Sequence, residues 1–469
     1  MTRAEFPLSA AAVAAAVGGR VARGDAARRF AAVSIDSRTV APGALFVAIR
    51  GDRLDGHAFV AEAVAKGAGG VVVSDPTSAA GLDGAVPVVV VDDTTGALQE
   101  LARHVRRVSG ARVVAITGSA GKTTTKEATA LFLEARYRTM RNRGNLNNHI
   151  GLPLSLLELQ GGAEVAVVEL GMNHAGEISR LVAIADPDVR VWTNVGTAHL
   201  EYFGSQDAIA EAKAEILENA RPDTVLVANA DDERIMDRVP RFAGRVVTFG
   251  VAGPATVRAV HVTSGGLAGS RALVRAPTGD VELETRLPGR GNLLNVLAAA
   301  AVAVDMGVSL ADIASRAARL CPAAHRGEVV TLAGGVTVID DCYNASPSAV
   351  AQALDLLAAA PAGRRRVAFL GEMLELGPGS AELHRECGRL AAGAGVGALI
   401  TVGGAAAFAL GEGAVAAGLP AAAVEHADDS DHAAALAGAL VRDGDVVLVK
   451  GSRGVRMERV VERLKAERG

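Results

Sequence analysis

The sequence has few aromatic residues, few cysteines and no excess of either charge. Aromatic residues make up 3% of the 469 residues, so the core must be built from small aliphatic side chains. They are also too few to form the aromatic belt that is typical of membrane proteins. Lys and Arg number 48 and Asp and Glu number 52, which gives a net charge of −4. This balance argues against a nucleic-acid partner, because such proteins neutralise phosphates with an excess of Lys and Arg.

The cysteines Cys321, Cys342 and Cys387 are widely spaced and form no C-x-x-C pair. The spacing indicates neither a disulfide framework nor a zinc site, and it favours a reducing compartment, so we expect a cytoplasmic protein. We expect all three to be small buried residues.

Two apolar segments resemble membrane signals. Ala is the commonest residue of 6–19, and Ser9 and the glycines at 18 and 19 predict the two ends of a short helix. Residues 390–411 carry no charge, but the glycines at 393, 395, 397, 403 and 404 interrupt them, and the run ALITV at 398–402 predicts a buried strand between helices. We therefore expect no membrane insertion.

Alternating strand and helix patterns predict an α/β protein with about three domains, since one domain usually holds roughly 150 residues. We place the domains at residues 1–95, 96–319 and 320–469. The first is a small α/β domain, and the last is a Rossmann-like α/β domain. The central domain is expected to contain a doubly wound, mostly parallel sheet of the P-loop type, with a small antiparallel sheet added over residues 245–287.

The strongest motif follows the predicted strand at 112–117 and opens a helix. Backbone N–H groups in such a glycine loop cradle phosphates, Lys122 can reach the outer phosphates, and the Thr123 hydroxyl suits Mg²⁺. The loop is shorter than the common Walker pattern, which points to a particular subgroup of phosphate-binding proteins. Its residues are Gly118, Ser119, Ala120, Gly121, Lys122, Thr123 and Thr124.

Other polar residues follow predicted strands, where open α/β sheets bind ligands. Glu169 is a candidate Mg²⁺ ligand. His199 is equally compatible with a structural and a functional role, and Lys213 alone has the pattern of a solvated lysine paired with Glu211 or Glu215.

In the third region, the acidic pair at 340–341 suits a ribose or a metal, although the sequence DDCYNASP also fits an ordinary turn. Lys450 and Arg453 offer cations to an anionic substrate. Two polar clusters in the first region, DSR at 36–38 and DGH at 55–57, have the pattern of surface loops.

These motifs, in this order, resemble the Mur ligases, which are ATP-dependent amide-forming enzymes of peptidoglycan precursor synthesis. The resemblance rests on TGSAGKTTTKE, GNLNNHIGLP, VVELGMN and NVGTAHLE, and it covers nearly the whole chain. The segments IDSRTVAPGALFVAIRGDRLDGHAF, DDCYNASPSA and GEMLELG resemble the subgroup that joins D-alanyl-D-alanine to UDP-N-acetylmuramoyl-tripeptide.

The resemblance implies a role for each domain: the first for the UDP-sugar, the second for ATP, and the third to close on ATP and bind the dipeptide. It implies two Mg²⁺ ions, held by Thr123, Glu169, His199 and Lys213, with Lys213 carbamylated. Lys122, Glu169, His199 and Lys213 would be catalytic. ATP would also contact Asn292, Asn295, Arg326 and Asp341. The other substrates would contact Ser37, Arg38, His57, Asn344, Lys450 and Arg453.

Three alternatives stay open at this point. The neighbouring ligase that adds the third amino acid and a folylpolyglutamate-type synthase belong to the same class, but YNASP stands where those enzymes have a D-Y-A-H-x-P segment. A P-loop ATPase that acts as a switch or binding module belongs to another class. We expect a monomer.

Overall fold

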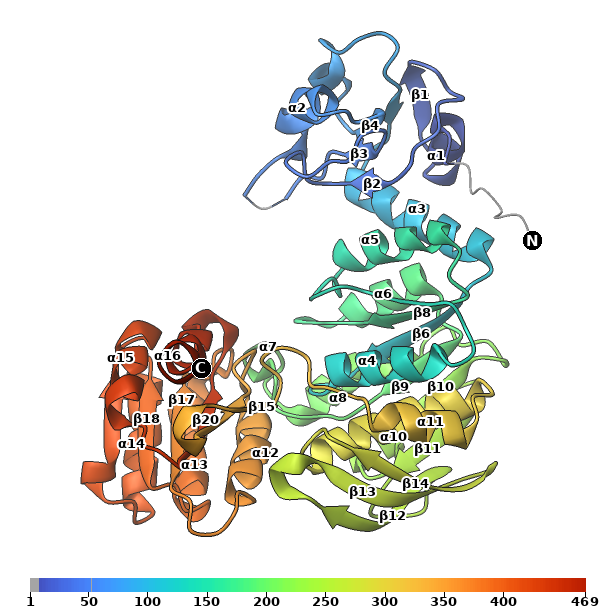
Figure 1. Cartoon of the computed structure of the whole chain (residues 1–469). Coiled ribbons are helices and arrows are strands. Elements are labelled where there is room, and N and C mark those ends of the chain that lie inside the picture. The colour runs from blue at the N-terminus through green and yellow to red at the C-terminus, as the bar shows by residue number, and fades with distance from the viewer. Residues whose placement is uncertain (1–7, 52) are drawn as a thin grey trace. The chain divides into compact units, whose positions relative to one another are not determined.

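The computed structural model describes residues 8–51 and 53–469, which fold into three β-sheets with helices around them (Figure 1). The sheets contain five, nine and six strands and follow one another along the chain. The expected α/β class with three domains is confirmed, and the exact domain boundaries stay predictions. Among the described residues, no helix has the length and apolar character that a membrane crossing requires.

The chain divides into two compact units, and the division passes through the nine-stranded sheet, so each unit is described by itself. The strand order of that sheet is β14-β13-β12-β11-β10-β9-β6-β8-β7.

The first unit contains the described residues up to Ile116, together with Arg136–Arg190 and Glu215–Val225. Its five-stranded sheet has the order β1-β5-β4-β3-β2 and is parallel except for the edge strand β1. The elements are α1 (Ala10–Ala16), β1 (Arg20–Arg23), β2 (Val33–Ser34), β3 (Leu45–Val47), α2 (Val60–Ala65), β4 (Gly70–Val73), β5 (Val88–Val90), α3 (Thr94–Ser109), β6 (Arg112–Thr117), β7 (Thr139–Arg141), α5 (Gly151–Leu157), β8 (Val165–Glu169), α6 (Glu177–Ala185) and β9 (Val189–Trp192). Strands β6 and β9 continue into the second unit.

The predicted N-terminal helix is confirmed, because Ser9 caps α1 by accepting a hydrogen bond from the amide of Ala12, and Gly18 follows the helix with a φ of 67°. Residues 6 and 7 of the predicted segment lie outside the described residues.

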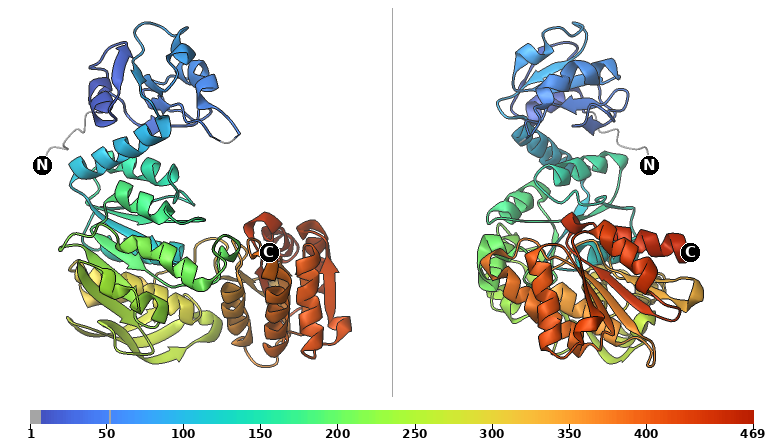
Figure 2. Two further views of the ribbon diagram at one scale, coloured as in Figure 1. Left: turned by 180° about the vertical axis from the view of Figure 1, so that it is seen from behind. Right: turned by 90° about the vertical axis from the view of Figure 1, so that its left-hand side faces the viewer.

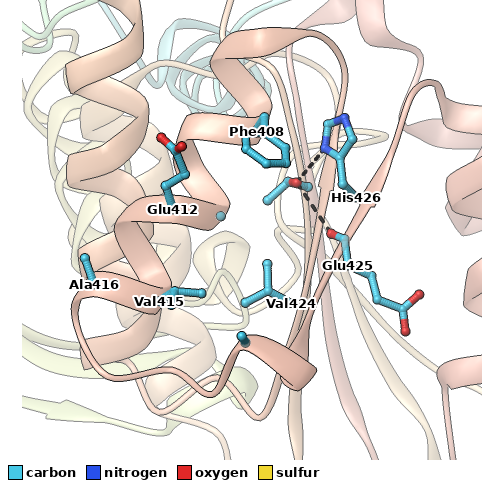
Figure 3. Close-up of a pocket in the computed structure, with 10 residues that line it drawn as sticks. Phe408, Glu412, Val415, Ala416, Val424, Glu425 and His426 are labelled. Carbon is cyan, nitrogen blue, oxygen red and sulfur yellow. Dashed lines mark hydrogen bonds between the residues drawn. The ribbon is translucent and has the colours of Figure 1, made fainter.

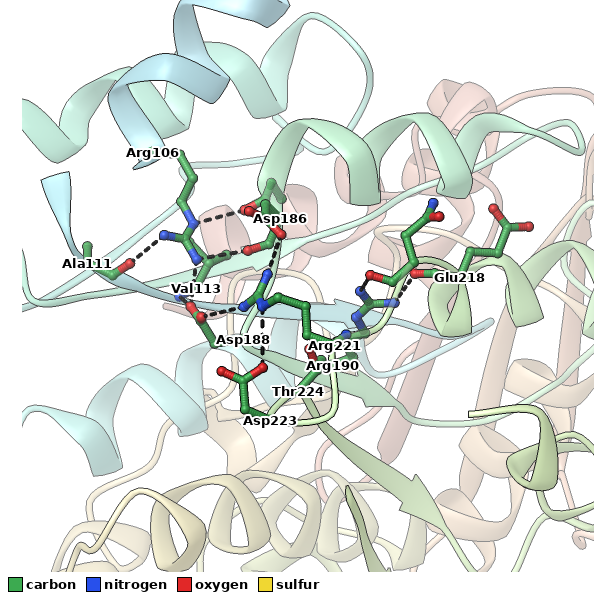
Figure 4. A network of polar contacts seen from close by, with 12 residues as sticks. Arg106, Ala111, Val113, Asp186, Asp188, Arg190, Glu218, Arg221, Asp223 and Thr224 are labelled. Atoms are coloured by element: carbon green, nitrogen blue, oxygen red, sulfur yellow. Dashed lines mark hydrogen bonds and ion pairs between the residues drawn. The ribbon is translucent and has the colours of Figure 1, made fainter. Parts of the chain in front are cut away.

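A buried polar network stabilises the first unit (Figure 4). Arg106 of α3 donates to the backbone oxygens of Ala111, Ala185 and Asp186 and to the Asp188 carboxylate, at 2.7–3.1 Å. Arg221 donates to the carboxylates of Asp186 and Asp188. A guanidinium has five N–H donors in a fixed plane, so a single buried arginine can join a helix to several loop carbonyls.

The second unit contains Thr117–Ala135, Val191–Ala214 and Leu226–Gly469. Its first elements are α4 (Lys122–Leu133), α7 (Leu200–Phe203), α8 (Gln206–Ala214), β10 (Val225–Asn229), α9 (Glu233–Met236), β11 (Arg245–Gly250), β12 (Val257–Ser264), β13 (Ser270–Ala276), β14 (Gly279–Thr285), α10 (Arg290–Asp305) and α11 (Leu310–Ala317). Strands β12, β13 and β14 are antiparallel, as predicted, whereas β11 pairs with β12 in parallel. The added strands continue the central sheet rather than form a separate one.

The six-stranded sheet has the order β15-β16-β20-β17-β18-β19 and is parallel except for the edge strand β15. Its elements are β15 (Glu328–Thr331), β16 (Thr337–Asp340), α12 (Pro347–Ala358), β17 (Arg366–Gly371), α13 (Ser380–Gly393), β18 (Ala398–Val402), α14 (Ala405–Ala416), β19 (Val424–Ala427), α15 (Ser430–Leu440), β20 (Val446–Lys450) and α16 (Glu458–Arg468). Helices α12, α13 and α14 cover one face, and α15 and α16 cover the other (Figure 2).

The uncharged segment 390–411 is the end of α13, the buried strand β18 and the start of α14, as predicted. The cysteines are all free. Cys342 and Cys387 are buried, but Cys321 is exposed, so the expectation that all three are buried is wrong for Cys321. Cys321 precedes β15 in a segment without regular structure, where no helix or strand face covers it.

Candidate active site

The glycine loop joins β6 to α4, as the sequence predicts, and its two glycines stand where no side chain fits. Gly118 has a φ of 151°, and a Cβ there would lie 1.9 Å from Oγ1 of Thr193. Gly121 has a φ of 79°, and a Cβ there would lie 2.1 Å from Oδ1 of Asn295. The backbone therefore makes the close turn that exposes N–H groups at the start of α4, where the helix dipole favours an anion.

Two residues that follow β9, neither of them among the predicted site residues, hold this loop. The Asn194 side chain accepts from the Ala120 amide at 2.9 Å and donates to the Ala120 oxygen at 3.0 Å. Thr193 Oγ1 donates to the same oxygen at 2.9 Å. Their position at the start of the segment TNVGTAHLE, directly after a strand, was the available signal, since strand ends meet at one edge of a parallel sheet.

Helix α10 brings two predicted ATP contacts, Asn292 and Asn295, near the loop. The Asn295 side chain accepts from Thr125 Oγ1 at 3.3 Å and donates to Asn292 Oδ1 at 3.3 Å. Asn292 in turn donates to the Pro288 oxygen at 2.8 Å. Both amides thus lie in one hydrogen-bonded row that leads to the start of α4.

Three predicted catalytic groups lie close enough to perturb one another. Lys213 is 2% exposed, because it follows the buried Ile209 and Ala210 by four and three residues and so shares their face of α8. The alternative of a solvated Lys213 is wrong. Burial lowers the pKa of Lys213 well below its ordinary value, and the charge of Lys122 acts in the same direction.

His199 belongs to the same group of charges. Burial lowers the pKa of His199, the charges of Lys122 and Lys213 add to the effect, and the carboxylate of Glu375 opposes it. Lys122, at the first position of α4, donates from Nζ to the Gly118 oxygen at 2.7 Å. The positive charge of Lys122 and the two groups whose pKa is lowered, His199 and Lys213, therefore lie next to the glycine loop.

Glu375 is the partner of His199, with 2.6 Å between Oε2 and Nδ1 of the ring. Both residues have a positive φ, 65° for His199 and 62° for Glu375, which is uncommon outside glycine. A second contact, from the Glu201 amide at the start of α7 to the Glu375 oxygen at 2.9 Å, adds to this link. The GEMLELG segment thus contributes a residue that sequence reasoning did not assign.

Glu169 ends β8 in the first unit, and its residue is 2% exposed. Its amide donates to Oδ1 of Asn142 at 3.0 Å, which fixes the backbone at the strand end. The carboxylate therefore lies at the carboxyl edge of the sheet, as predicted, while its role as a metal ligand stays a prediction.

In the third region, strand order brings Asp341, Asn344 and Lys450 together. Because β20 lies between β16 and β17, the residue after β16 is next to the last residue of β20. Lys450 is 3% exposed, and its Nζ donates to Oδ2 of Asp341 at 2.5 Å and to the Asn344 oxygen at 3.1 Å. Lys450 thus positions the loop that carries Asp341.

Arg326 and Arg453 meet at one aromatic ring. The guanidinium carbon of Arg326 lies 3.8 Å from the ring centroid of Tyr343, and that of Arg453 lies 5.5 Å from it. Cation–π contacts of this kind orient the guanidinium groups while leaving their N–H donors able to bind an anion.

The predicted sugar-binding residues of the first unit differ in exposure. Arg38 is exposed and pairs with Asp36 at 2.7 Å, and its hydrogen bonds lower the pKa of Asp36 to about 2. Ser37 and His57 are buried. The His57 Nε2 accepts from the Ser74 amide at 2.9 Å, so Nδ1 carries the proton and donates to Asp55 at 2.6 Å. His57 thus organises its loop through both ring nitrogens.

A cavity of about 470 Å³ lies in the third region between α14, β18 and β19 (Figure 3). Phe408 and His426 face each other across it edge to face, with centroids 5.6 Å apart, and Val415 and Val424 line its floor. None of the residues predicted to bind nucleotide or substrate lines this cavity.

The fold and the glycine loop define an ATP-binding α/β enzyme. Lys122 and the buried amine of Lys213 lie next to the loop that is expected to bind the phosphates of the nucleotide. The model of the Mur ligase middle domain matches residues 116–303, that of the Mur ligase glutamate ligase domain matches 325–453, and that of the Mur ligase family catalytic domain matches 29–106. The chain belongs to the Mur ligase family.

Individual relatives are similar over nearly the full chain. The UDP-N-acetylmuramoyl-tripeptide–D-alanyl-D-alanine ligase of Escherichia coli is 37% identical, over 92% of this chain and 93% of that protein. A MurF crystal structure from Acinetobacter baumannii has a TM-score of 0.87 at 31% identity and covers 98% of this chain and 99% of its own. The MurF ligase of Thermotoga maritima in complex with ADP has a TM-score of 0.81 at 32% identity and covers 93% and 97%.

Proposed function

We propose that this Mur ligase joins D-alanyl-D-alanine to UDP-N-acetylmuramoyl-tripeptide, forming an amide bond and releasing ADP and phosphate. The observation that carries the proposal is the similarity over nearly the whole chain to ligases named for this reaction. The glycine loop at the start of α4 supports the use of ATP, since such a loop binds phosphates.

The reaction has two steps. The terminal carboxylate of the tripeptide attacks the γ-phosphate of ATP, which gives an acyl phosphate and ADP. Both reactants are anions, so Lys122 and the N–H groups of the loop reduce their repulsion and stabilise charge on the transferred phosphoryl oxygens. The protein contributes position and electric field here, rather than a covalent intermediate of its own.

The donor set fits Mg²⁺ if Lys213 is carbamylated. A protonated lysine would repel the ion, but burial favours the neutral amine, and a neutral amine can add CO₂ and lose a proton to become an anionic carbamate. Thr123, Glu169, His199 and the carbamate of Lys213 would then hold the ions. Bound there, Mg²⁺ would offset the negative charge of the phosphates.

In the second step the amine of D-alanyl-D-alanine displaces phosphate from the acyl phosphate through a tetrahedral intermediate. Acyl phosphates hydrolyse readily, so water must be excluded, and closure of residues 320–469 on ATP is the proposed means. Arg326 and Asp341 would contact the nucleotide, and Asn344 and Arg453 the incoming dipeptide. Asp341 rather than Asp340 suits the ribose, because Asp340 is fully buried and the Asp341 side chain is 26% exposed.

A phosphate-release assay tests the function. The ligase should release phosphate only when ATP, UDP-N-acetylmuramoyl-tripeptide and D-alanyl-D-alanine are all present, and mass spectrometry should find the pentapeptide product. Steady ATP hydrolysis without the dipeptide would favour an ATPase switch instead. Replacing D-alanyl-D-alanine by diaminopimelate or glutamate, with the matching acceptors, separates this ligase from its neighbours in the family.

Location and assembly belong to the same proposal. Two of the three substrates are nucleotides, and the exposed thiol of Cys321 is free, which suits a reducing cytoplasm. We propose a monomer. The first region would bind the UDP-sugar through Ser37, Arg38 and His57.

A further inference from the structure

Three potential metal ligands from separate positions converge at the start of the third region. His325 precedes β15, Asp340 ends β16, and Cys342 lies two residues beyond. Nδ1 of His325 lies 2.9 Å from Oδ2 of Asp340, and Sγ of Cys342 lies 3.0 Å from Oδ1 of Asp340 and 3.5 Å from Nδ1 of His325. The cluster joins a nitrogen, an oxygen and a sulfur around one point.

The spacing is close to that of a tetrahedral zinc site. Bond lengths of about 2.0 Å to nitrogen and oxygen and about 2.3 Å to sulfur place ligand atoms about 3.3–3.5 Å apart. The sulfur–nitrogen distance already has this value. The two carboxylate oxygens of Asp340 lie close to the other ligands, Oδ2 at 2.9 Å from the His325 nitrogen and Oδ1 at 3.0 Å from the Cys342 sulfur.

Burial and backbone geometry fix the ligands before any ion binds. Asp340 is 0% exposed and Cys342 is 1% exposed, whereas the His325 side chain is 33% exposed. His325 has a φ of 61°, an unusual backbone conformation that is held by the hydrogen bond from the Tyr343 amide to the His325 oxygen. The partly exposed His325 side chain places one side of the cluster toward solvent, where water is the expected fourth ligand.

The surroundings of the thiol are negative. The carboxylates of Asp340, Asp341 and Glu458 lie close enough to Cys342 to act on its thiol electrostatically. Oε2 of Glu458, at the start of α16, is buried and has no hydrogen-bond partner among the described residues. A buried carboxylate oxygen in this state is costly unless a cation or a proton donor is near.

We propose that His325, Asp340 and Cys342 form a binding site for a thiophilic divalent cation such as Zn²⁺, distinct from the Mg²⁺ ligands of the ATP site. The Sγ–metal bond forms as the thiol releases its proton to solvent, and no electron is transferred. The soft sulfur and the imidazole select Zn²⁺ over Mg²⁺, which prefers oxygen ligands. The site does not depend on the proposed reaction.

Occupancy of this site would act on the nucleotide residues. Arg326 follows His325, and Asp341 lies between Asp340 and Cys342, so a metal that fixes the three ligands also fixes the backbone that carries two predicted ATP contacts. Zn²⁺ would therefore change the affinity for ADP.

Binding of Co²⁺ to the chelator-treated full-length chain tests the site directly. Co²⁺ bound by a cysteine thiolate absorbs in the near ultraviolet through sulfur-to-metal charge transfer, and Mg²⁺-type oxygen sites give no such band. We expect one equivalent of Co²⁺ to produce the band and Zn²⁺ to abolish it by displacement. Cys342→Ser should lose the band, whereas Cys321→Ser, which removes an exposed thiol nearby, should keep it.

His325→Gln provides a variant whose folding is safer, because its side chain is partly exposed. It should weaken Co²⁺ binding by about tenfold or more, and its circular dichroism spectrum should remain that of the folded chain. The proposal is overturned if the wild-type chain gives no band, if Cys342→Ser retains it, or if His325→Gln binds Co²⁺ as tightly as the wild type. None of these readouts uses ligase activity, so a failure here is distinct from a failure of the proposed function.

Discussion

Nδ1 of His199 and Oε2 of Glu375 lie 2.6 Å apart, which links the loop after β9 to the loop after β17. The contact places a carboxylate from the GEMLELG segment on a predicted catalytic histidine. Since both backbones have a positive φ, the surrounding structure must hold the two residues in place. Glu375 is therefore a positioning residue for His199.

Glu375→Gln should lower the pKa of His199 further, because the carboxylate is the group that raises it. A histidine whose pKa is lowered on folding contributes stability that is present above its unfolded value of 6.5 and is lost as the pH falls through the folded value. Below pH 6.5, the free energy of unfolding of the variant should therefore fall more steeply with decreasing pH than that of the wild type. NMR titration of the imidazole, assigned with His199→Gln, measures the shift.

Glu382→Gln, which alters an exposed carboxylate on α13, is the matched control and should leave the His199 titration unchanged. A His199 pKa that stays constant or rises in Glu375→Gln would contradict the role assigned to the contact.

Gly121→Ala should weaken ATP binding by at least about tenfold, because strain in the left-handed region costs about 1–2 kcal/mol and the new Cβ would collide with Asn295. Gly162→Ala is a close control, since Gly162 has a φ of 78° and nothing within 4 Å of its Cβ position. It should lose comparable stability with unchanged affinity. Calorimetric titration with ATP distinguishes the two, and equal affinity losses would refute the collision.

Lys213→Ala should reduce kcat by about a hundredfold or more, since it removes the group that would carry charge to the metal site. If the carbamate is the active form, short carboxylic acids should restore part of the rate, and removal of bicarbonate should slow the wild-type enzyme. Lys465→Ala, on the C-terminal helix α16, should show neither effect. Absence of any rescue would leave the carbamate without support.

Arg106→Met should destabilise the chain by about 3 kcal/mol, because it leaves buried carbonyls and part of the Asp188 charge without a donor. Arg107→Met removes the next residue, which is exposed, and should change stability by less than about 0.5 kcal/mol. The urea midpoint measures both. Similar midpoints for the two variants would show that the network of Figure 4 contributes little.

The sequence determined the features that depend on local pattern. Strand runs and the loop that follows them placed β6, α4 and β18 nearly to the residue, because alternation, glycine position and helix capping are set by neighbours along the chain. The helical period of α8 also placed Lys213 on the same face as the apolar Ile209 and Ala210, although the neighbouring Glu211 and Glu215 suggested a solvated residue.

Tertiary structure decided which distant residues meet. Insertion of β20 between β16 and β17 is a choice of strand order, and it alone brings Lys450 to Asp341. The pairing of His199 with Glu375 and the meeting of His325 with Cys342 depend likewise on how loops from different strands pack. The spacing of residues along the sequence does not predict such contacts. They are selected by the free energy of burial and of charge interactions, which exist only in the folded chain.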